Sequence, residues 1–360
     1  FPGCAGPLLA HLAEHEPSRL QRAEIAGYPV DAIVHRLTGA ITIDASDASL
    51  PFLDTTTRRY SEQALRACGI AHLRSLLVEP APLGTMFGLS APLASSLGLP
   101  SGLPVSAAPF DLPACALGAG VSQVGDGTVV VGTTLGAEVL TDTVLPGTPE
   151  EPAGMWLAIP RENRWLRAMP AMVGTANLDW VLSMVGATTK DLDELLAASP
   201  PGANGVSALS FLSASGERAP FVDPLARGQF TGLTMATSRA DLVRALCEAV
   251  AYAARHNLAA CGCSGELSAC GGGARSSQWS QIFADVIGTP IHIPRELGVG
   301  ILGAAMTAWD SLGAPIDAEA WRADRRVVTP DPATVEYYQH GYREYLNSVG
   351  RARGGWHYDD

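Results

Sequence analysis

Apolar residues recur at helical spacing in the second half of the chain and predict a long helix from Ser238 to Ala260. Ser238 and Asp241 fit an S-x-x-D capping box, in which side chains satisfy free backbone N–H groups at a helix start. A further helix is expected from Leu302 to Leu312, and the last one starts at Asp331-Pro332, a cap followed by proline. The buried face of the long helix should carry Leu242, Leu246, Ala249, Val250 and Ala253.

Strand patterns alternate with these helices. The β-branched run Thr128 to Val131, the turn Gly132 to Gly136 and the run Ala137 to Leu140 predict a strand–turn–strand unit. Another short strand is expected from Pro290 to Pro294. Strands and helices that alternate along the chain indicate an α/β fold.

The first part of the chain has weaker patterns. Residues 7–40 are expected to be helical with a break at Pro17, and residues 61–73 to form a short helix. A polar, small-residue stretch fills 41–60, and the Pro- and Gly-rich stretch 80–109 predicts loops and short strands near a domain boundary.

Three glycines at Gly271 to Gly273 follow the expected strand end Leu267 to Ala269 and open what the pattern predicts to be a helix. Apolar residues then recur at Trp279, Ile282, Phe283 and Val286. Glycine lets the backbone approach a ligand closely, and a helix N-terminus attracts anions. The run is typical of a nucleotide site, although most glycine-rich turns are only tight turns.

Composition narrows the function classes. The 360 residues allow two domains and carry a net charge of −12 without a run of basic residues, which argues against a nucleic-acid partner. Lys190 is the only lysine, so no Walker A motif exists.

The cysteines and the apolar runs indicate the cellular compartment of the protein. Seven irregularly spaced cysteines favour reduced thiols over a disulfide framework. No apolar run reaches membrane-spanning length, and the start lacks a basic region before an apolar one. We expect a cytoplasmic protein without a membrane partner.

Four segments together resemble the FGGY family of carbohydrate kinases. They cover nearly the whole chain, in the family's order and spacing. The second signature fits except at Cys247, where a larger apolar residue is usual. The segments are Gly102 to Val105 with Asp111 and Gly118 to Gly120; Gly132 to Thr134; Gly216 to Pro220 continuing to Gly228 to Leu233 and Asp241 to Glu248; and Gly271 to Asp285 with Gly303 to Ala305.

The resemblance implies a two-domain actin/hexokinase-like ATPase fold of ribonuclease H-like domains, with ligands bound between them. Residues 1–111 would be the remainder of a sugar-binding first domain, 112–350 the nucleotide-binding second domain, and 351–360 a tail. The family's opening Asp-x-Gly-Thr turn and its Gln-x-His segment do not occur here. We therefore expect an incomplete first domain.

The resemblance also assigns roles to residues. Asp111 corresponds to the catalytic base that takes the proton of the attacking hydroxyl; without the family context it would be a loop aspartate. Gly132, Thr133 and Thr134 correspond to the turn that grips the phosphates of ATP, and would otherwise be a hairpin turn. Gly272, Gly273 and Ser276 correspond to the adenosine site. Gln281 and Asp285 are expected to be structural, as are Glu217 and Arg218.

The function implied is ATP- and Mg²⁺-dependent phosphorylation of a small sugar or polyol. Residues 108–118 look closest to the L-xylulose kinase-like branch, so a ketopentose such as xylulose is the expected substrate, followed by erythritol. No protein ligand is assigned to the metal. Family resemblance also suggests a homodimer.

Two alternatives stay open. The chain could be a nucleotide-binding module of the same fold without catalysis. His11-Leu12-Ala13-Glu14-His15 also matches the H-x-x-E-H pattern of inverted zinc peptidases, but an amphipathic surface helix explains it as well. Gly118-Ala119-Gly120 is only a weak signal for a dinucleotide-binding turn, because no strand precedes it.

Overall fold

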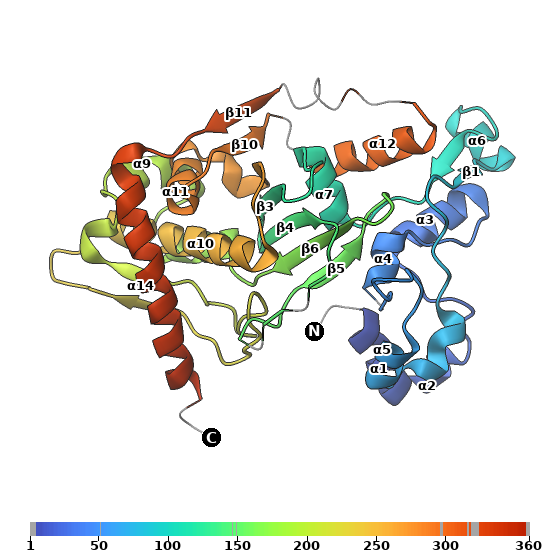
Figure 1. Cartoon of the computed structure of the whole chain (residues 1–360), viewed down its shortest axis with the longest axis horizontal. Helices are drawn as coiled ribbons and strands as arrows, with labels where there is room; N and C mark the ends of the chain where they lie inside the picture. The colour runs from blue at the N-terminus through green and yellow to red at the C-terminus, as the bar shows by residue number, and fades with distance from the viewer. Residues whose placement is uncertain are drawn as a thin grey trace.

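A mixed seven-stranded sheet forms the centre of the computed structural model, which describes residues 5–50, 52–145, 147–148, 150–295, 298–314, 317 and 324–357 (Figure 1). The strand order is β11-β10-β9-β3-β4-β6-β5. Strands β10, β9 and β3 run parallel, and the other neighbours are antiparallel. The strands are β3 (Gly127–Val131), β4 (Leu135–Thr141), β5 (Met155–Ala158), β6 (Trp165–Pro170), β9 (Leu267–Cys270), β10 (Ile291–Pro294) and β11 (Arg325–Val328).

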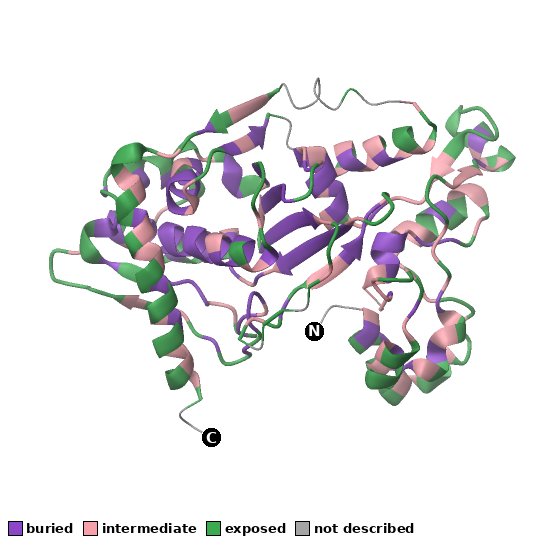
Figure 2. Ribbon diagram, in the orientation of Figure 1, coloured by how far each residue is buried: buried purple, intermediate pink, exposed green. Residues whose placement is uncertain are grey.

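Alternate residues of these strands enter two different cores. Val129, Val131 and Val139 pack with α10 (Arg239–Cys261) and α11 (Ser277–Ile287). Leu140 and Leu166 pack on the other face with α7 (Asp111–Ala119). This is the period-two pattern of a sheet that is covered on both faces. Figure 2 shows the resulting buried centre.

Helix α12 (Val299–Ser311) packs on α7 with almost no space between the two backbones. A Cβ atom added at Gly118 would lie 1.8 Å from the Val299 carbonyl oxygen, and one at Gly303 would lie 1.9 Å from that of Ala114. Glycine is therefore required on both helices where they cross. The sequence Gly118-Ala119-Gly120 ends a helix, and Gly120 caps it at φ 104°.

The first part of the chain has its own core and lies against the edge of the sheet (Figure 1). Ala158 and Trp165 of β5 and β6 join this core. The Arg58 guanidinium stacks on the Trp165 ring at 5.0 Å and donates a hydrogen bond of 2.7 Å to the Arg164 carbonyl. The elements of this part are α1 (Ala5–His15), α2 (Pro17–Leu20), α3 (Pro29–Thr38), α4 (Ala45–Ser49), α5 (Glu62–Ala67), η1 (Ala71–Leu76), β1 (Met86–Gly88), α6 (Ala91–Leu97) and β2 (Pro104–Ser106).

Helix α14 (Pro332–Trp356) lies outside α10 and α11. Its Tyr338 and Tyr345 are buried against Tyr252 of α10, so these tyrosines belong to the core. The remaining elements are α8 (Thr175–Met184), η2 (Thr189–Asp191), α9 (Leu192–Ala197), η3 (Ala203–Gly205), β7 (Ser207–Leu209), β8 (Gln229–Thr231) and η4 (Gly272–Arg275).

Several sequence predictions are confirmed, and others need correction. The helical stretch expected over 7–40 is broken not only at Pro17 but also over 21–28, between α2 and α3, and the single helix expected over 61–73 is α5 followed by η1. The α/β class, the β3–β4 unit and the Ser238 capping box are as predicted. The glycine run does not open a helix: Gly272 to Arg275 form a separate 3-10 turn, and α11 begins at Ser277 with Ser276 as its cap. Helix α12 begins at Val299, three residues earlier than expected.

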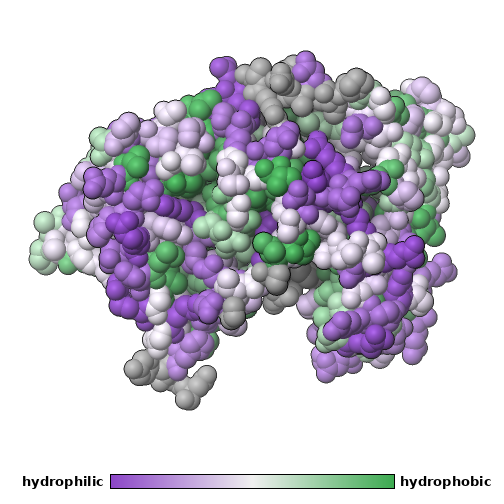
Figure 3. Space-filling model, in the orientation of Figure 1, coloured by the Kyte–Doolittle hydropathy of each residue, from purple (hydrophilic) through white to green (hydrophobic). Residues whose placement is uncertain are grey.

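The surface is mostly hydrophilic on the face shown in Figure 3, with smaller apolar areas between the polar ones. No helix among the described residues is long and apolar enough to cross a membrane.

Candidate active site

The turn Gly132 to Thr134 joins β3 to β4 and is held against the start of α8. The Thr175 N–H donates to the Gly132 carbonyl at 2.8 Å, and the Ala176 N–H donates to that of Thr133 at 3.3 Å. A Cβ at Gly174 would lie 2.5 Å from the Thr133 oxygen, so only glycine allows this approach. The side chains of Thr133 and Thr134 remain exposed to solvent.

The glycine loop 271–273 lies beside the end of β3, next to this turn. Gly271 has φ +92°, and a Cβ there would lie 2.7 Å from the Val131 carbonyl oxygen. A Cβ at Gly273 would lie 2.4 Å from the Val131 side chain. Gly272, in contrast, faces open space. Packing therefore explains Gly271 and Gly273, while the space above Gly272 is free for a ligand.

A cavity of about 490 Å³ opens in front of this loop. It brings Gly272, Gly273 and Ser276 together with Thr175. The Thr175 backbone is hydrogen-bonded to the turn Gly132 to Thr134. Its charged lining consists of Lys190, Arg275, Asp179 and Asp193. Lys190, the chain's only lysine, is exposed and lines this cavity as well.

Ser276 has a structural role that the sequence did not reveal. Its hydroxyl oxygen accepts the Trp279 N–H at 3.0 Å, and the hydroxyl donates to the Asp193 carboxylate. The Ser277 hydroxyl donates to the same carboxylate at 3.2 Å. A carboxylate thus already lies at the N-terminus of α11, where it favours the helix dipole. Sequence reasoning missed Asp193 because it lies more than 80 residues away in the chain.

Asp111 begins α7, and its side chain is exposed. Partial burial raises its pKa, although the Leu112 N–H works in the opposite direction. Leu112 packs close to Gly136, where an added Cβ would lie 3.6 Å from Leu112 Cδ2. Gly136 lies two residues after the Gly132 to Thr134 turn, so the candidate base and the turn lie at the same end of the sheet.

Helix α4 connects Asp111 to the first part of the chain. The Ser46 hydroxyl oxygen accepts the Phe110 N–H at 2.8 Å, and the Ser49 hydroxyl oxygen accepts the Ala158 N–H at 2.9 Å. Both serines come from a stretch that sequence reasoning described only as polar and small. The Ser46 hydroxyl thus fixes the residue that precedes Asp111, and the Ser49 hydroxyl holds α4 on β5.

A buried carboxyl group, Asp47, lies on the same helix. It is 1% exposed, and its Oδ2 has no hydrogen-bond partner among the described residues. Burial, with the carboxylates of Asp31, Asp44 and Asp111, raises its pKa to about 8. Sequence reasoning missed this group because only the fold shows its burial.

Glu138 of β4 is a second buried acid near Asp111. Neither of its carboxylate oxygens has a partner within the described part of the chain. Burial raises its pKa well above the ordinary value, and Cys115 and Asp111 add to the shift. Burial therefore favours the protonated form of this carboxyl group.

The residues expected to be structural are structural. Glu217 is 2% exposed and accepts the backbone N–H groups of Met172, Arg218 and Ala219. Asp285 accepts from Gln281 and from the Asp331 backbone, both at 2.8 Å.

The two histidines of the H-x-x-E-H pattern lie on one face of α1, with ring centroids 4.4 Å apart. Helix α1 ends at His15. The described residues contain no group of three or more His, Cys, Asp or Glu side chains that could hold a metal ion.

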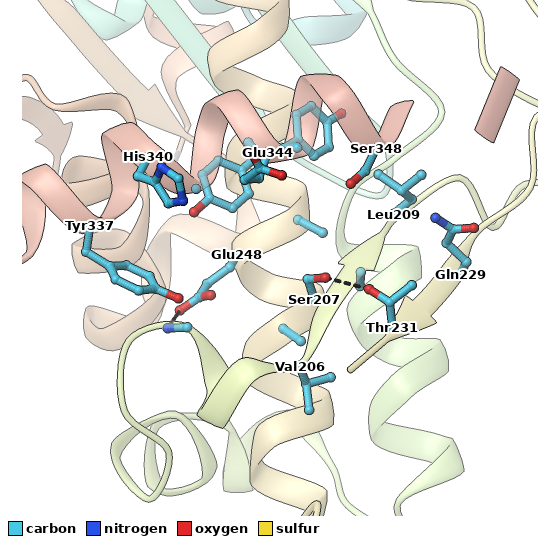
Figure 4. Close-up of a pocket in the computed structure, with 17 residues that line it drawn as sticks. Val206, Ser207, Leu209, Gln229, Thr231, Glu248, Tyr337, His340, Glu344 and Ser348 are labelled. Atoms are coloured by element: carbon cyan, nitrogen blue, oxygen red, sulfur yellow. Dashed lines mark hydrogen bonds between the residues drawn. The ribbon is translucent and has the colours of Figure 1, made fainter. Parts of the chain in front are cut away.

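Another cavity, of about 250 Å³, lies between α10, α14 and the β7–β8 pair (Figure 4). Figure 4 shows Glu248 near Tyr337 and His340, with Ser207 and Thr231 bonded to each other on the opposite side. Glu248 accepts from Arg244 and Tyr338 at 2.8 Å. None of the predicted site residues lines this cavity.

Comparison with known protein families now identifies the fold. The model of the C-terminal domain of the FGGY family of carbohydrate kinases matches residues 127–310, and that of the N-terminal domain matches residues 1–118. The chain belongs to the FGGY family of carbohydrate kinases. This confirms the predicted family.

Curated relatives include two kinases of different substrates. The chain is 32% identical to erythritol kinase of Brucella abortus (strain 2308) over 86% of its own length and 62% of that protein. It is 31% identical to xylulose kinase of Escherichia coli (strain K12) over 86% of its length and 64% of that protein. The chain thus spans less than two thirds of the length of these relatives.

Solved structures agree with this FGGY fold. A xyloylose kinase from Brucella ovis matches with a TM-score of 0.87 and 28% identity over 98% of this chain and 74% of that one. The xylulose kinase from Rhodospirillum rubrum matches with a TM-score of 0.86 and 27% identity over 99% and 74%. The two-domain actin/hexokinase-like ATPase fold is therefore confirmed.

Other expectations are not confirmed. The N-terminal family model matches from residue 1 to 118, so the matches give no support to an incomplete first domain. The domain boundaries at 111 and 350 and the roles of the site residues remain predictions.

Proposed function

We propose that this chain is an ATP-dependent kinase for a small sugar or polyol, with the residues predicted above as its site. One observation carries the proposal. The turn Gly132 to Thr134 and the loop Gly271 to Gly273 lie together at the end of β3, and both connect to one cavity through Thr175 and Gly272.

The cavity fits a nucleotide in size and chemistry. Its volume of about 490 Å³ is in the range of small-molecule sites, and Gly272 leaves room for close approach. Lys190 and Arg275 supply positive charge beside it, and Asp179 and Asp193 line it as well. Mg²⁺ bound with ATP would offset the charge of the phosphates during transfer.

Within this site, the backbone N–H groups and hydroxyls of Gly132, Thr133 and Thr134 would hold the phosphates. Asp111 would orient the attacking hydroxyl of the sugar and accept its proton. Its raised pKa suits that task, because a stronger base holds the proton more firmly once it is transferred. Gly272, Gly273 and Ser276 would position the adenosine.

A ketopentose such as xylulose is the proposed substrate. The relatives include kinases of erythritol, xylulose and L-fuculose, so the family alone does not choose among them. A homodimer is proposed from family resemblance.

The test is ADP release from the protein with MgATP across a panel of ketopentoses, polyols and aldoses. The control is Asp111→Asn, which keeps the shape of the side chain and removes the base. We expect a substrate-dependent signal that falls by about 10²–10⁴-fold in the variant. ADP binding without any substrate-dependent release would instead favour a nucleotide-binding module without catalysis.

A further inference from the structure

The cavity drawn in Figure 4 lies apart from the proposed kinase site. Its volume is about 250 Å³, and its walls come from α10, α14 and the β7–β8 pair. None of its lining residues also lines the larger cavity in front of Gly272. The cavity between α10 and α14 therefore has room for a separate ligand that is smaller than a nucleotide.

A buried carboxylate, Glu248, forms the inner end of this cavity. Its side chain is almost completely enclosed, with 5% of the residue exposed. Its Oε1 accepts three hydrogen bonds, from the Gly202 N–H at 3.0 Å and from Arg244 and Tyr338 at 2.8 Å each. Its Oε2 accepts none from any residue that the structure describes, and it is not sealed off from the cavity. This oxygen is therefore a ready acceptor for an N–H or O–H group of a ligand.

Two tyrosine hydroxyls lie beside this carboxylate. Tyr252 and Tyr337 line the same cavity, and neither hydroxyl forms a hydrogen bond within the described part of the chain. Glycines leave room for both: a Cβ at Gly341 would lie 2.1 Å from the Tyr252 oxygen, and one at Gly202 would lie 1.7 Å from the Tyr337 oxygen. Burial and then the Glu248 carboxylate raise the pKa of both phenols, so the charge of Glu248 reaches both hydroxyls. The three free oxygens equal in number the three N–H donors of a primary ammonium group.

The charges around the cavity favour a cation. Its lining includes two carboxylates, the buried Glu248 and the exposed Glu344 on α14, and neither lysine nor arginine occurs among its described lining residues. His340, also exposed, is the one further lining residue that can become charged near neutral pH. Three tyrosine rings complete the wall, and aromatic rings attract a cation placed over their faces. An anion would instead meet two carboxylates without a permanent positive charge.

We propose that this cavity binds a short aliphatic diamine in its doubly protonated form. One ammonium group donates to Glu248 Oε2 and to the hydroxyls of Tyr252 and Tyr337, and the methylene chain lies against the tyrosine rings. The second ammonium group lies at Glu344, whose carboxylate accepts only a hydrogen bond of 3.3 Å from Asn347 within the described structure. An uncharged diol of the same length forms no ion pair with either carboxylate, so charge distinguishes the ligand.

Calorimetric titration of the whole chain with putrescine tests this proposal without nucleotide or sugar, so its result is independent of kinase activity. We expect saturable binding of one putrescine per chain with a Kd of about 1 mM or tighter. Butanediol has the same carbon chain without charge and should give no saturable heat. n-Butylamine lacks the second ammonium group and should bind about tenfold more weakly than putrescine. No saturable heat with putrescine, or equal binding of butanediol, would overturn the proposal.

Two substitutions at exposed side chains locate the ligand and leave the buried Arg244–Glu248 ion pair intact. Glu344→Gln should weaken putrescine binding about tenfold and leave n-butylamine binding nearly unchanged. Tyr337→Phe removes one acceptor of the inner ammonium group and should weaken both amines about three- to tenfold.

Glu336→Gln is the matched control, because Glu336 is exposed on the same helix and does not line the cavity. It should leave putrescine binding unchanged, and thermal unfolding without ligand checks that all three variants are folded. If Glu344→Gln weakens putrescine binding no more than Glu336→Gln does, or if Tyr337→Phe has no effect, the diamine does not occupy this cavity and the proposal fails.

Discussion

Gly271 and Gly272 are neighbouring glycines that are needed for different reasons. Gly271 needs its positive φ and the missing Cβ to pass the Val131 carbonyl. Gly272 has neither constraint. The sequence predicted a glycine-rich ligand loop but could not separate these roles, because the atoms opposite Gly271 belong to β3, about 140 residues earlier in the chain.

Alanine at Gly271 should therefore affect stability, whereas alanine at Gly272 should affect ligand binding. Gly271→Ala should lower the free energy of unfolding by about 1–2 kcal/mol or more, since a left-handed backbone strains an L-residue. Gly272→Ala should change stability by less than about 0.5 kcal/mol but weaken ADP binding at least about tenfold. Urea unfolding and calorimetric titration measure the two effects. Equal stability loss in both variants would contradict this assignment.

Lys190 offers a direct chemical label of the proposed nucleotide cavity. Periodate-oxidised ATP carries aldehydes that form a Schiff base with a nearby amine, and borohydride makes the link permanent. We expect the label on Lys190, protection by excess ATP, and no label on this site in Lys190→Arg. Peptide mass mapping reads the result. Labelling that ATP does not prevent would remove Lys190 from the proposed nucleotide site.

Asp47 predicts how stability depends on pH. Its pKa is raised from 3.8 to about 8 on folding, so the folded state binds the proton more tightly than the unfolded state. Its contribution to stability is therefore fully present below pH 3.8 and is lost as the pH rises toward 8.

Asp47→Asn removes this proton and should reduce the loss of stability between pH 5 and pH 8 by at least about 1 kcal/mol, the equivalent of one pKa unit. Urea unfolding of both proteins at the two pH values measures the difference, with Asp54→Asn on an exposed turn as the control. Parallel pH profiles for the wild type and Asp47→Asn would show that Asp47 is ionised in the fold.

At the scale of elements, the sequence predicted those helices and strands whose signals lie within a few adjacent residues. The Ser238 capping box and the β3–β4 unit need only adjacent residues, and both are present. Helix α6 was missed because its Pro- and Gly-rich surroundings indicate loops. The start of α11 was placed too early because the pattern does not show that Ser276 caps the helix.

The close crossing of α7 and α12 allows a prediction about the stability of the fold. Gly303→Ala would put a Cβ 1.9 Å from the Ala114 carbonyl oxygen, so the helices must separate. We expect a destabilisation of about 1–3 kcal/mol. Gly350→Ala, in the open on α14, should instead stabilise by about 0.5–1 kcal/mol. Thermal unfolding of both variants checks the contrast, and a neutral Gly303→Ala would show that the crossing can relax.

At the scale of the whole molecule, the sequence predicted the fold class and family but not which polar groups would be buried together. Asp47, Glu138 and Asp193 come from three separate elements, and only tertiary contacts bring them near the predicted site. The docking of the first part on Trp165 likewise depends on residues about 100 positions apart.

The parallel pairing of β3 with β9 has a consequence for the order in which the molecule folds. The β3–β4 hairpin closes locally, but the Glu266 N–H meets the Asp126 carboxylate across 140 residues of chain. Contacts between residues so far apart in the chain form slowly, because a large loop must close before the contacts can stabilise the fold. We therefore expect the Gly132 to Thr134 turn to form early and the proposed nucleotide cavity to form last, so ligand binding during refolding would report completion of the fold.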